Sequence, residues 1–116
     1  QSSALSFAVS AIGVLVFALA KQKDKPHIQD SLKFLTRDLS YREAAYPFYF
    51  EYYMSQALFH ADLAEWRKWN ALNIRYLAAI QSPDGSWPGS KGKAFNTSGA
   101  LLSLALNYRF LPIYER

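Results

Sequence analysis

Apolar residues recur at helical spacing along most of the chain, and no window alternates apolar and polar residues as a strand does. One apolar stripe has intervals of four, three and four residues: Ile28, Leu32, Leu35 and Leu39. Such spacing places all members on one face of a helix. Asp24, Lys25 and Pro26 precede the stripe and form a helix start, with the aspartate as N-cap and the proline in the first turn. The pattern predicts an all-α protein.

The rest of the chain divides into further helices and one long loop. Residues 48–61 form an aromatic helical run, and Asp62 to Glu65 make a capping box in which the glutamate returns to the cap amide. The helix after this box carries four large apolar residues on one side: Trp66, Trp69, Leu77 and Ile80. A loop rich in proline and glycine covers 81–95, and a last helix is expected over about 96–110, with Pro112 beyond its end.

Residues 1–20 carry no charge, and Lys21, Lys23 and Lys25 follow directly. Twenty uncharged residues are about enough to span a bilayer. The many small side chains of this segment are equally typical of helices packed closely inside a protein. A buried helix, a membrane span and the remnant of a targeting segment all remain open, and membrane association through residues 1–20 stays possible.

The chain also resembles itself at a fixed offset. A shift of 42 residues places Phe59 on Phe17 and Tyr76 on Phe34. We therefore expect helical hairpins over about 3–39 and 48–80, with the last helix beginning a third unit. The first helix of each hairpin is apolar nearly all round and the second is amphipathic, which predicts an inner and an outer layer.

Composition removes several classes of function. Of the 116 residues, 51% are hydrophobic and 19% charged, so the chain is expected to fold. The absence of cysteine excludes a disulfide framework, a thiolate zinc site and a cysteine nucleophile. The net charge of +4 comes from scattered basic residues, and we expect no nucleic-acid partner.

The long loop contains the sequence QSPDGSW, in which Gln81, Gly85 and Trp87 resemble the QW motif of squalene and oxidosqualene cyclases. The following residues 95–101 are similar to the start of the inner helix after that motif. The ending 108–116 is similar to the C-terminus of bacterial proteins with prenyltransferase and squalene-oxidase repeats. The resemblance covers about 48–116 and implies an α/α toroid, of which residues 1–116 would be one partial domain with an incomplete ring.

In this family the motif's Gln and Trp brace an outer helix against the next inner helix, so the motif is structural. The residues themselves fit that role. The Gln81 amide can meet exposed groups at a helix end, Gly85 permits a tight turn, and Trp87 supplies buried area.

The chemistry known for this family needs groups that this chain lacks. Its five aspartates are too far apart to form the Asp-x-Asp-Asp motif of the cyclases: Asp24, Asp30, Asp38, Asp62 and Asp84. Without cysteine, neither the prenyltransferase zinc site nor a thioester can form. The spacing of His27 and His60 suits no metal motif. We therefore expect no catalytic residue, metal or cofactor in this chain alone.

The aromatic run is the candidate wall of a ligand cavity: Phe48, Tyr49, Phe50, Glu51, Tyr52 and Tyr53. Aromatic faces accommodate apolar chains such as isoprenoids and attract cations. The alternative is that these residues only fill the space between helices. Glu51 becomes a candidate general acid only if it is buried, since burial raises the pKa of a carboxyl group.

The expected function is a non-catalytic α/α-toroid scaffold or a module that binds a hydrophobic ligand or a protein. The missing hairpins would come from the rest of a longer protein or from a partner chain, because repeat units bury their faces only against neighbours. One alternative is a fragment of an isoprenoid cyclase whose acid lies elsewhere. Another is a small membrane-associated subunit of a larger complex.

Overall fold

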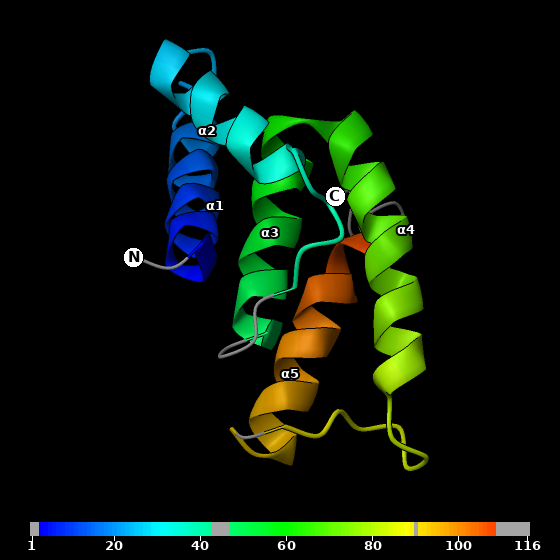
Figure 1. Cartoon of the computed structure of the whole chain (residues 1–116). Coiled ribbons are helices and arrows are strands. Elements are labelled where there is room, and N and C mark those ends of the chain that lie inside the picture. Colours follow the sequence, from blue (N-terminus) through cyan, green and yellow to red (C-terminus); the bar gives the residue numbers. More distant parts are fainter. Residues whose placement is uncertain (1–2, 43–46, 90, 109–116) are drawn as a thin grey trace.

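The computed structural model describes residues 3–42, 47–89 and 91–108, which form helices joined by shorter connections (Figure 1). The elements in chain order are α1 (Ser3–Leu19), α2 (Pro26–Thr36), α3 (Pro47–Ala61), α4 (Leu63–Ile80), α5 (Lys93–Leu104) and a 3-10 turn (Ala105–Tyr108). No strand occurs among the residues described. The prediction of an all-α protein is therefore confirmed.

The helices pair as two antiparallel hairpins. In the first, Phe17 near the end of α1 packs edge-on against His27 near the start of α2. Phe7 near the start of α1 in turn contacts Phe34 near the end of α2. In the second hairpin, Phe59 near the end of α3 meets Trp66 in the first turn of α4. Asp62 connects α3 and α4 and accepts a hydrogen bond from the Glu65 amide, so the predicted N-cap is present. The other half of the predicted capping box differs, because the Asp62 amide donates to the Leu58 carbonyl and the Glu65 carboxylate pairs with Lys68.

Helix α3 lies between α1 and α5, and these three helices run in the same direction (Figure 1). Phe7 and Phe50 meet near the starts of α1 and α3. The described residues form a slab of 44 × 43 × 20 Å. A thickness of 20 Å corresponds to about two helix diameters, so the slab is two helices thick.

The core consists of two clusters of buried side chains. The larger cluster joins α1, α2, α3 and α4 and includes Phe7, Val14, Leu35, Phe50, Met54, Leu58 and Trp69. The smaller cluster joins α3, α4, α5 and the loop before α5: Phe48, Leu77, Trp87 and Ala100. The predicted stripes account for much of this burial, although Ile80, the last residue of α4, remains 37% exposed.

Several helix ends differ from the sequence prediction. The N-cap position of α2 is Lys25 and not Asp24, with Pro26 as first helical residue. Helix α5 begins at Lys93, within the segment expected as loop, and changes to a 3-10 turn at Ala105. Residues 109–116, which contribute to the family resemblance, lie outside the described residues.

Helix α1 has 17 residues, and its described side chains include Phe7, Ala11 and Val14 in the core. Among the described parts of the chain, no helix combines the length and the apolar character needed to span a membrane.

Candidate functional site

The aromatic run on α3 does not form a single wall. Successive residues of a helix point about 100° apart, and the six side chains accordingly separate into different directions. Phe50 packs into the larger core cluster, against Phe7 and Tyr41. Glu51 is fully buried on the side of α3 that faces α4. Neither residue contributes to the groove formed by the other four.

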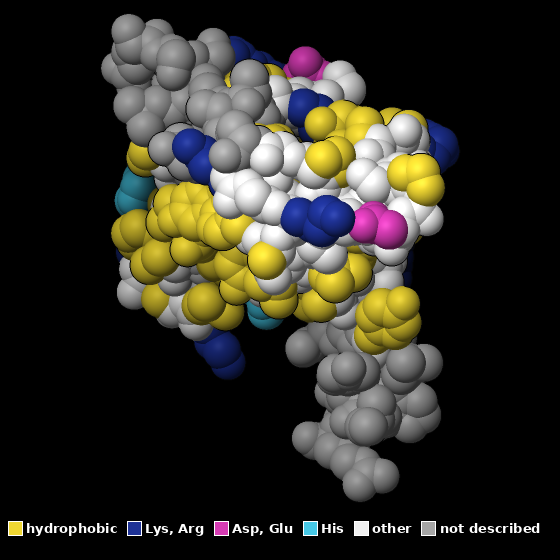
Figure 2. Space-filling model, turned by 90° about the horizontal axis from the view of Figure 1, so that it is seen from below, with side chains coloured by type: hydrophobic (Ala, Val, Ile, Leu, Met, Phe, Trp, Pro, Cys, Tyr) yellow, Lys and Arg dark blue, Asp and Glu magenta, His cyan; other side chains and the backbone are white. Residues whose placement is uncertain are grey.

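That groove lies between α3 and α5. Its lining residues are Phe48, Tyr49, Tyr52 and Tyr53 from α3 and Phe95, Ser98, Gly99 and Leu102 from α5. It holds about 220 Å³. At the end of the molecule where α3 and α5 begin, hydrophobic side chains form a broad surface patch with few charges (Figure 2). The groove therefore offers a partly open, mostly apolar binding surface.

The close approach of α3 and α5 at the groove depends on Gly99. A Cβ atom at this position would lie 2.7 Å from the Phe48 Cβ, which is shorter than any normal contact. Glycine is therefore the residue that lets the two helices touch.

The tyrosines of the groove interact with one another. The Tyr49 and Tyr53 rings meet edge to face with 4.9 Å between centroids, and Tyr52 and Tyr53 do so at 5.1 Å. A hydrogen bond with Tyr49, together with partial burial, raises the pKa of the Tyr53 phenol. A tyrosine phenol is neutral near neutral pH even without this shift, so the groove carries no charge from its tyrosines.

Glu51 is the centre of a buried polar network on the other side of α3. One of its carboxylate oxygens, Oε2, lies 3.2 Å from the Arg42 Nε. The Asn73 side-chain amide contacts the same carboxyl group and also lies 3.2 Å from the Ser103 hydroxyl. Ser103 donates to the Ala100 carbonyl at 2.7 Å. The network thus connects the segment after α2 with α3, α4 and α5.

Burial dominates the electrostatics of Glu51. Loss of solvation raises the pKa of its carboxyl group to about 7, although the Arg42 charge acts in the opposite direction. The Arg42 guanidinium also donates to the Leu39 and Tyr41 carbonyls and lies 4.6 Å from the centre of the Tyr76 ring. Burial and the nearby Glu51 charge raise the pKa of the Tyr76 phenol.

Glu51 meets the burial condition stated for a general acid. Its carboxyl group, however, faces Arg42 and Asn73 and does not line the groove. Sequence analysis did not identify Arg42, Asn73 or Ser103. The available signal was that Asn73 falls on the same helical face as Trp66, Trp69 and Leu77, so a polar residue interrupts a buried stripe.

The loop with the QW-like sequence connects α4 to α5 through Trp87. The indole Nε1 donates to the Leu77 carbonyl at 2.9 Å, and the Trp87 amide donates to the Thr97 hydroxyl at 3.0 Å. Leu77 is in the last turn of α4, where carbonyls lack intrahelical partners. Trp87 therefore supplies a hydrogen-bond donor to the end of α4. The Gln81 side chain instead donates to the Gly85 carbonyl within the loop. Gly85 has a φ of 88°, which favours glycine.

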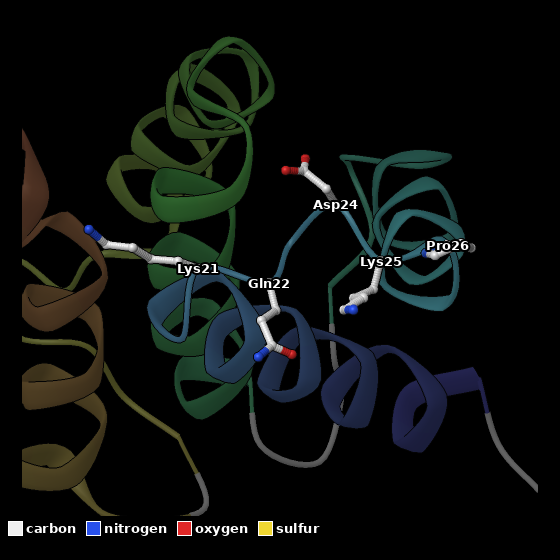
Figure 3. A pocket seen from close by; sticks show the side chains of 5 residues that line it. All are labelled: Lys21, Gln22, Asp24, Lys25 and Pro26. Atoms are coloured by element: carbon white, nitrogen blue, oxygen red, sulfur yellow. The ribbon is translucent and has the colours of Figure 1, made fainter.

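The basic connection between α1 and α2 borders an open hollow of about 420 Å³, lined by Lys21, Gln22, Asp24, Lys25 and Pro26. In Figure 3 the Lys21 side chain extends to the left, away from the other labelled residues, while that of Lys25 points downward, so their charges do not converge on one ligand. Across the described parts of the chain, no group of histidine and acidic side chains is placed to hold a metal ion.

No family model, curated protein or solved structure matches this chain.

Proposed function

We propose that this chain is a non-catalytic helical-hairpin scaffold of the α/α-toroid type whose α3–α5 groove binds an extended hydrophobic ligand. The observation that carries the proposal is the groove itself, with four aromatic side chains of α3 facing Phe95 and Leu102 of α5. Tyr49, Phe95 and Leu102 are each about half exposed, so a ligand would bury apolar surface that is now in water.

The arrangement of the helices supports the scaffold part of the proposal. Helix α3 lies between α1 and α5, and the three run in the same direction, as the inner helices of an α/α toroid would (Figure 1). Leu101 remains exposed on α5, outside the groove. Further hairpins, from the same protein or from a partner chain, would cover apolar surface of this kind.

The volume of the groove limits how much of a ligand it can contact. Pockets that enclose a drug-sized molecule hold about 300–1,000 Å³, whereas this groove holds about 220 Å³. It would therefore contact a section of a long, flexible apolar chain, such as an isoprenoid, with the tyrosine hydroxyls at the polar end. An uncharged isoprenoid alcohol is accordingly a suitable probe.

The test is titration of the chain with farnesol, followed by calorimetry and by the tyrosine ring resonances in NMR spectra. The variant Leu102→Lys places a charge in the groove, and the matched control Leu101→Lys places the same charge on the neighbouring exposed residue outside it. We expect Leu102→Lys to weaken binding about tenfold or more, because burial of a leucine side chain is worth about 1.5–3 kcal/mol. Leu101→Lys should leave the affinity unchanged.

Circular dichroism checks that both variants keep the helical content of the unmodified chain. The ligand proposal fails if the unmodified chain does not bind farnesol. It also fails if the two lysine variants lose affinity equally, since binding would then not depend on the groove.

A further inference from the structure

Helix α1 carries apolar side chains on two opposite faces. The inner face belongs to the larger core cluster: Phe7, Ala11 and Val14. Val16 points about 200° away from Val14, because successive residues of a helix are rotated by about 100°. The outer face consists of Val9, Val16 and Leu19, which are 59%, 55% and 59% exposed, and of the half-buried Ile12.

No element of the described chain covers this outer face. Helix α1 lies at one edge of the molecule and packs against α2 and α3 (Figure 1). A helix that is apolar all round is normally buried all round, whereas a solvated helix face carries polar or charged residues. Helix α1 contains no charged residue, and its outer face presents only aliphatic side chains to water. We therefore expect this face to have a partner.

A group of lysines follows the outer face directly, in the connection formed by residues 21–25. Lys21, Lys23 and Lys25 are all exposed, and none of them forms an ion pair within the described part of the chain. Asp24 is the only acidic residue in this connection, which therefore keeps a positive charge. Lys21 comes two residues after Leu19, and the field of an exposed charge extends about 10 Å at about 0.1 M salt. The partner of the aliphatic face therefore also meets the positive charge.

The area and the charge of this surface favour a lipid bilayer over a protein as the partner. The outer face extends about 15 Å along the helix axis, and its side chains are at most 59% exposed. This strip is far smaller than the ~800 Å² that each partner buries in a stable protein interface. A second copy that paired through α1 or α5 would also leave the lysines without partners, because neither helix contains an acidic residue.

We propose that the outer face of α1 and the lysines of residues 21–25 dock on the surface of an anionic membrane. The aliphatic side chains enter the boundary between headgroups and acyl chains, and the lysines contact the headgroup phosphates. A planar array of phosphates does not require the Lys21 and Lys25 side chains to point to one place (Figure 3). Because the inner face of α1 is held in the core, the helix lies along the membrane surface. The proposal does not depend on the groove, which α1 does not line.

The conformation of Lys21 allows its charge to be removed without disturbing the chain locally. Lys21 is the second residue after the end of α1 and has a φ of 60°. Its amide donates to the Ala18 carbonyl, and the Gln22 amide donates to the Phe17 carbonyl. Helices that end with this pair of hydrogen bonds usually have glycine at the position of Lys21. Lys21→Gly is therefore expected to keep the helix end and to remove one positive charge.

The test is co-sedimentation of the full chain with vesicles of phosphatidylcholine, prepared with and without phosphatidylglycerol. We expect the chain to bind the vesicles that contain phosphatidylglycerol, with an affinity that falls as salt is raised. Lys21→Gly and Lys23→Gln should each reduce this affinity about fivefold, the effect of one lysine near an anionic membrane surface. Leu19→Gln should reduce it by a similar factor, because it removes about half of the burial of a leucine side chain.

Two matched controls make the same changes on other helices. Lys68→Gln removes a lysine of α4 that pairs with Glu65, and Leu101→Gln changes a leucine of α5 that is 54% exposed. Both controls should bind the vesicles as the unmodified chain does. Circular dichroism checks that every variant keeps its helix content, and the lysine variants decide the question even if Leu19→Gln does not fold.

Three results would overturn the proposal. The first is that the unmodified chain does not bind vesicles containing phosphatidylglycerol, or binds pure phosphatidylcholine equally well. The second is that the controls lose as much affinity as the variants of α1 and residues 21–25. The third is a dimer in sedimentation velocity that Leu19→Gln dissociates, since a second copy would then cover the outer face of α1.

Discussion

Replacement of Trp87 by alanine tests how the loop between α4 and α5 contributes to stability. Trp87 is 4% exposed and packs with Phe48, Leu77 and Ala100 in the smaller core cluster. A buried tryptophan removes about 150–250 Å² from water, which at about 25 cal/mol per Å² amounts to roughly 4–6 kcal/mol. This figure is an upper estimate, and alanine retains part of the area. We expect a loss of about 3 kcal/mol in the free energy of unfolding.

A second contribution comes from the indole N–H. It donates to the Leu77 carbonyl at 2.9 Å, so alanine removes the partner of a carbonyl at the end of α4. The variant Trp87→Phe removes this donor and only part of the ring, so it retains more of the packing than alanine does. We expect it to cost about 1–2 kcal/mol, less than Trp87→Ala.

The assay is urea denaturation of each variant, followed by far-ultraviolet circular dichroism, which reports helix content and does not depend on tryptophan emission. The slope of the free energy of unfolding against urea concentration should be the same in all variants, so that differences in the midpoint report differences in stability. A loss below about 0.5 kcal/mol for Trp87→Ala is the value of an ordinary surface substitution. That result would refute the bracing role of Trp87 and the QW-like interpretation of the loop.

Two further predictions concern helix packing and pH. Gly99→Ala should cost about 1–3 kcal/mol in thermal or urea denaturation, because its Cβ would meet the Phe48 Cβ at 2.7 Å. Gly13→Ala, with no atom within 4 Å of the new Cβ, should instead be neutral or stabilising by up to about 1 kcal/mol; an equal loss at both sites would contradict the packing argument. Folding raises the pKa of the Glu51 carboxyl group from 4.5 to about 7, so between these pH values the folded chain holds a proton that the unfolded chain has lost. The contribution of Glu51 to the free energy of unfolding is therefore fully present below pH 4.5 and is lost as pH rises through 7, by about 3 kcal/mol in total. Denaturation at a series of pH values should show this fall in the unmodified chain and not in Glu51→Gln, and a flat profile in the unmodified chain would contradict it.

Much of the helical architecture could be predicted from the spacing of apolar residues. The stripe that includes Ile28, Leu32 and Leu35 became the buried face of α2. Helix ends were less well predicted, because neighbouring residues can each occupy the N-cap position. Asp24 is a good cap by residue type, yet the chain enters the helix at Pro26, and the cap position falls on Lys25.

The candidate site was predicted only in part. The aromatic run was recognised, but its division between groove and core depends on which helices lie on each side of α3. That information is tertiary and cannot be obtained from the run alone. The Glu51 network is still further from prediction, because Asn73 and Ser103 are 30 residues apart and meet only when α4 and α5 are packed. A buried stripe interrupted by Asn73 indicates an internal hydrogen bond but does not identify its partner.

The division of the core into two clusters has a consequence for cooperativity. Helix α5 and its preceding loop contribute buried hydrophobic side chains only to the small cluster, as Ala100 and Trp87, whereas α1 to α4 share the larger one. Segments with few buried contacts open more readily than the rest of a domain. Amide hydrogens of α5 should therefore exchange with solvent through a partial opening that leaves α1 to α4 folded. The loop and α5 would then detach and redock together, and the groove between α3 and α5 would form and disappear with them.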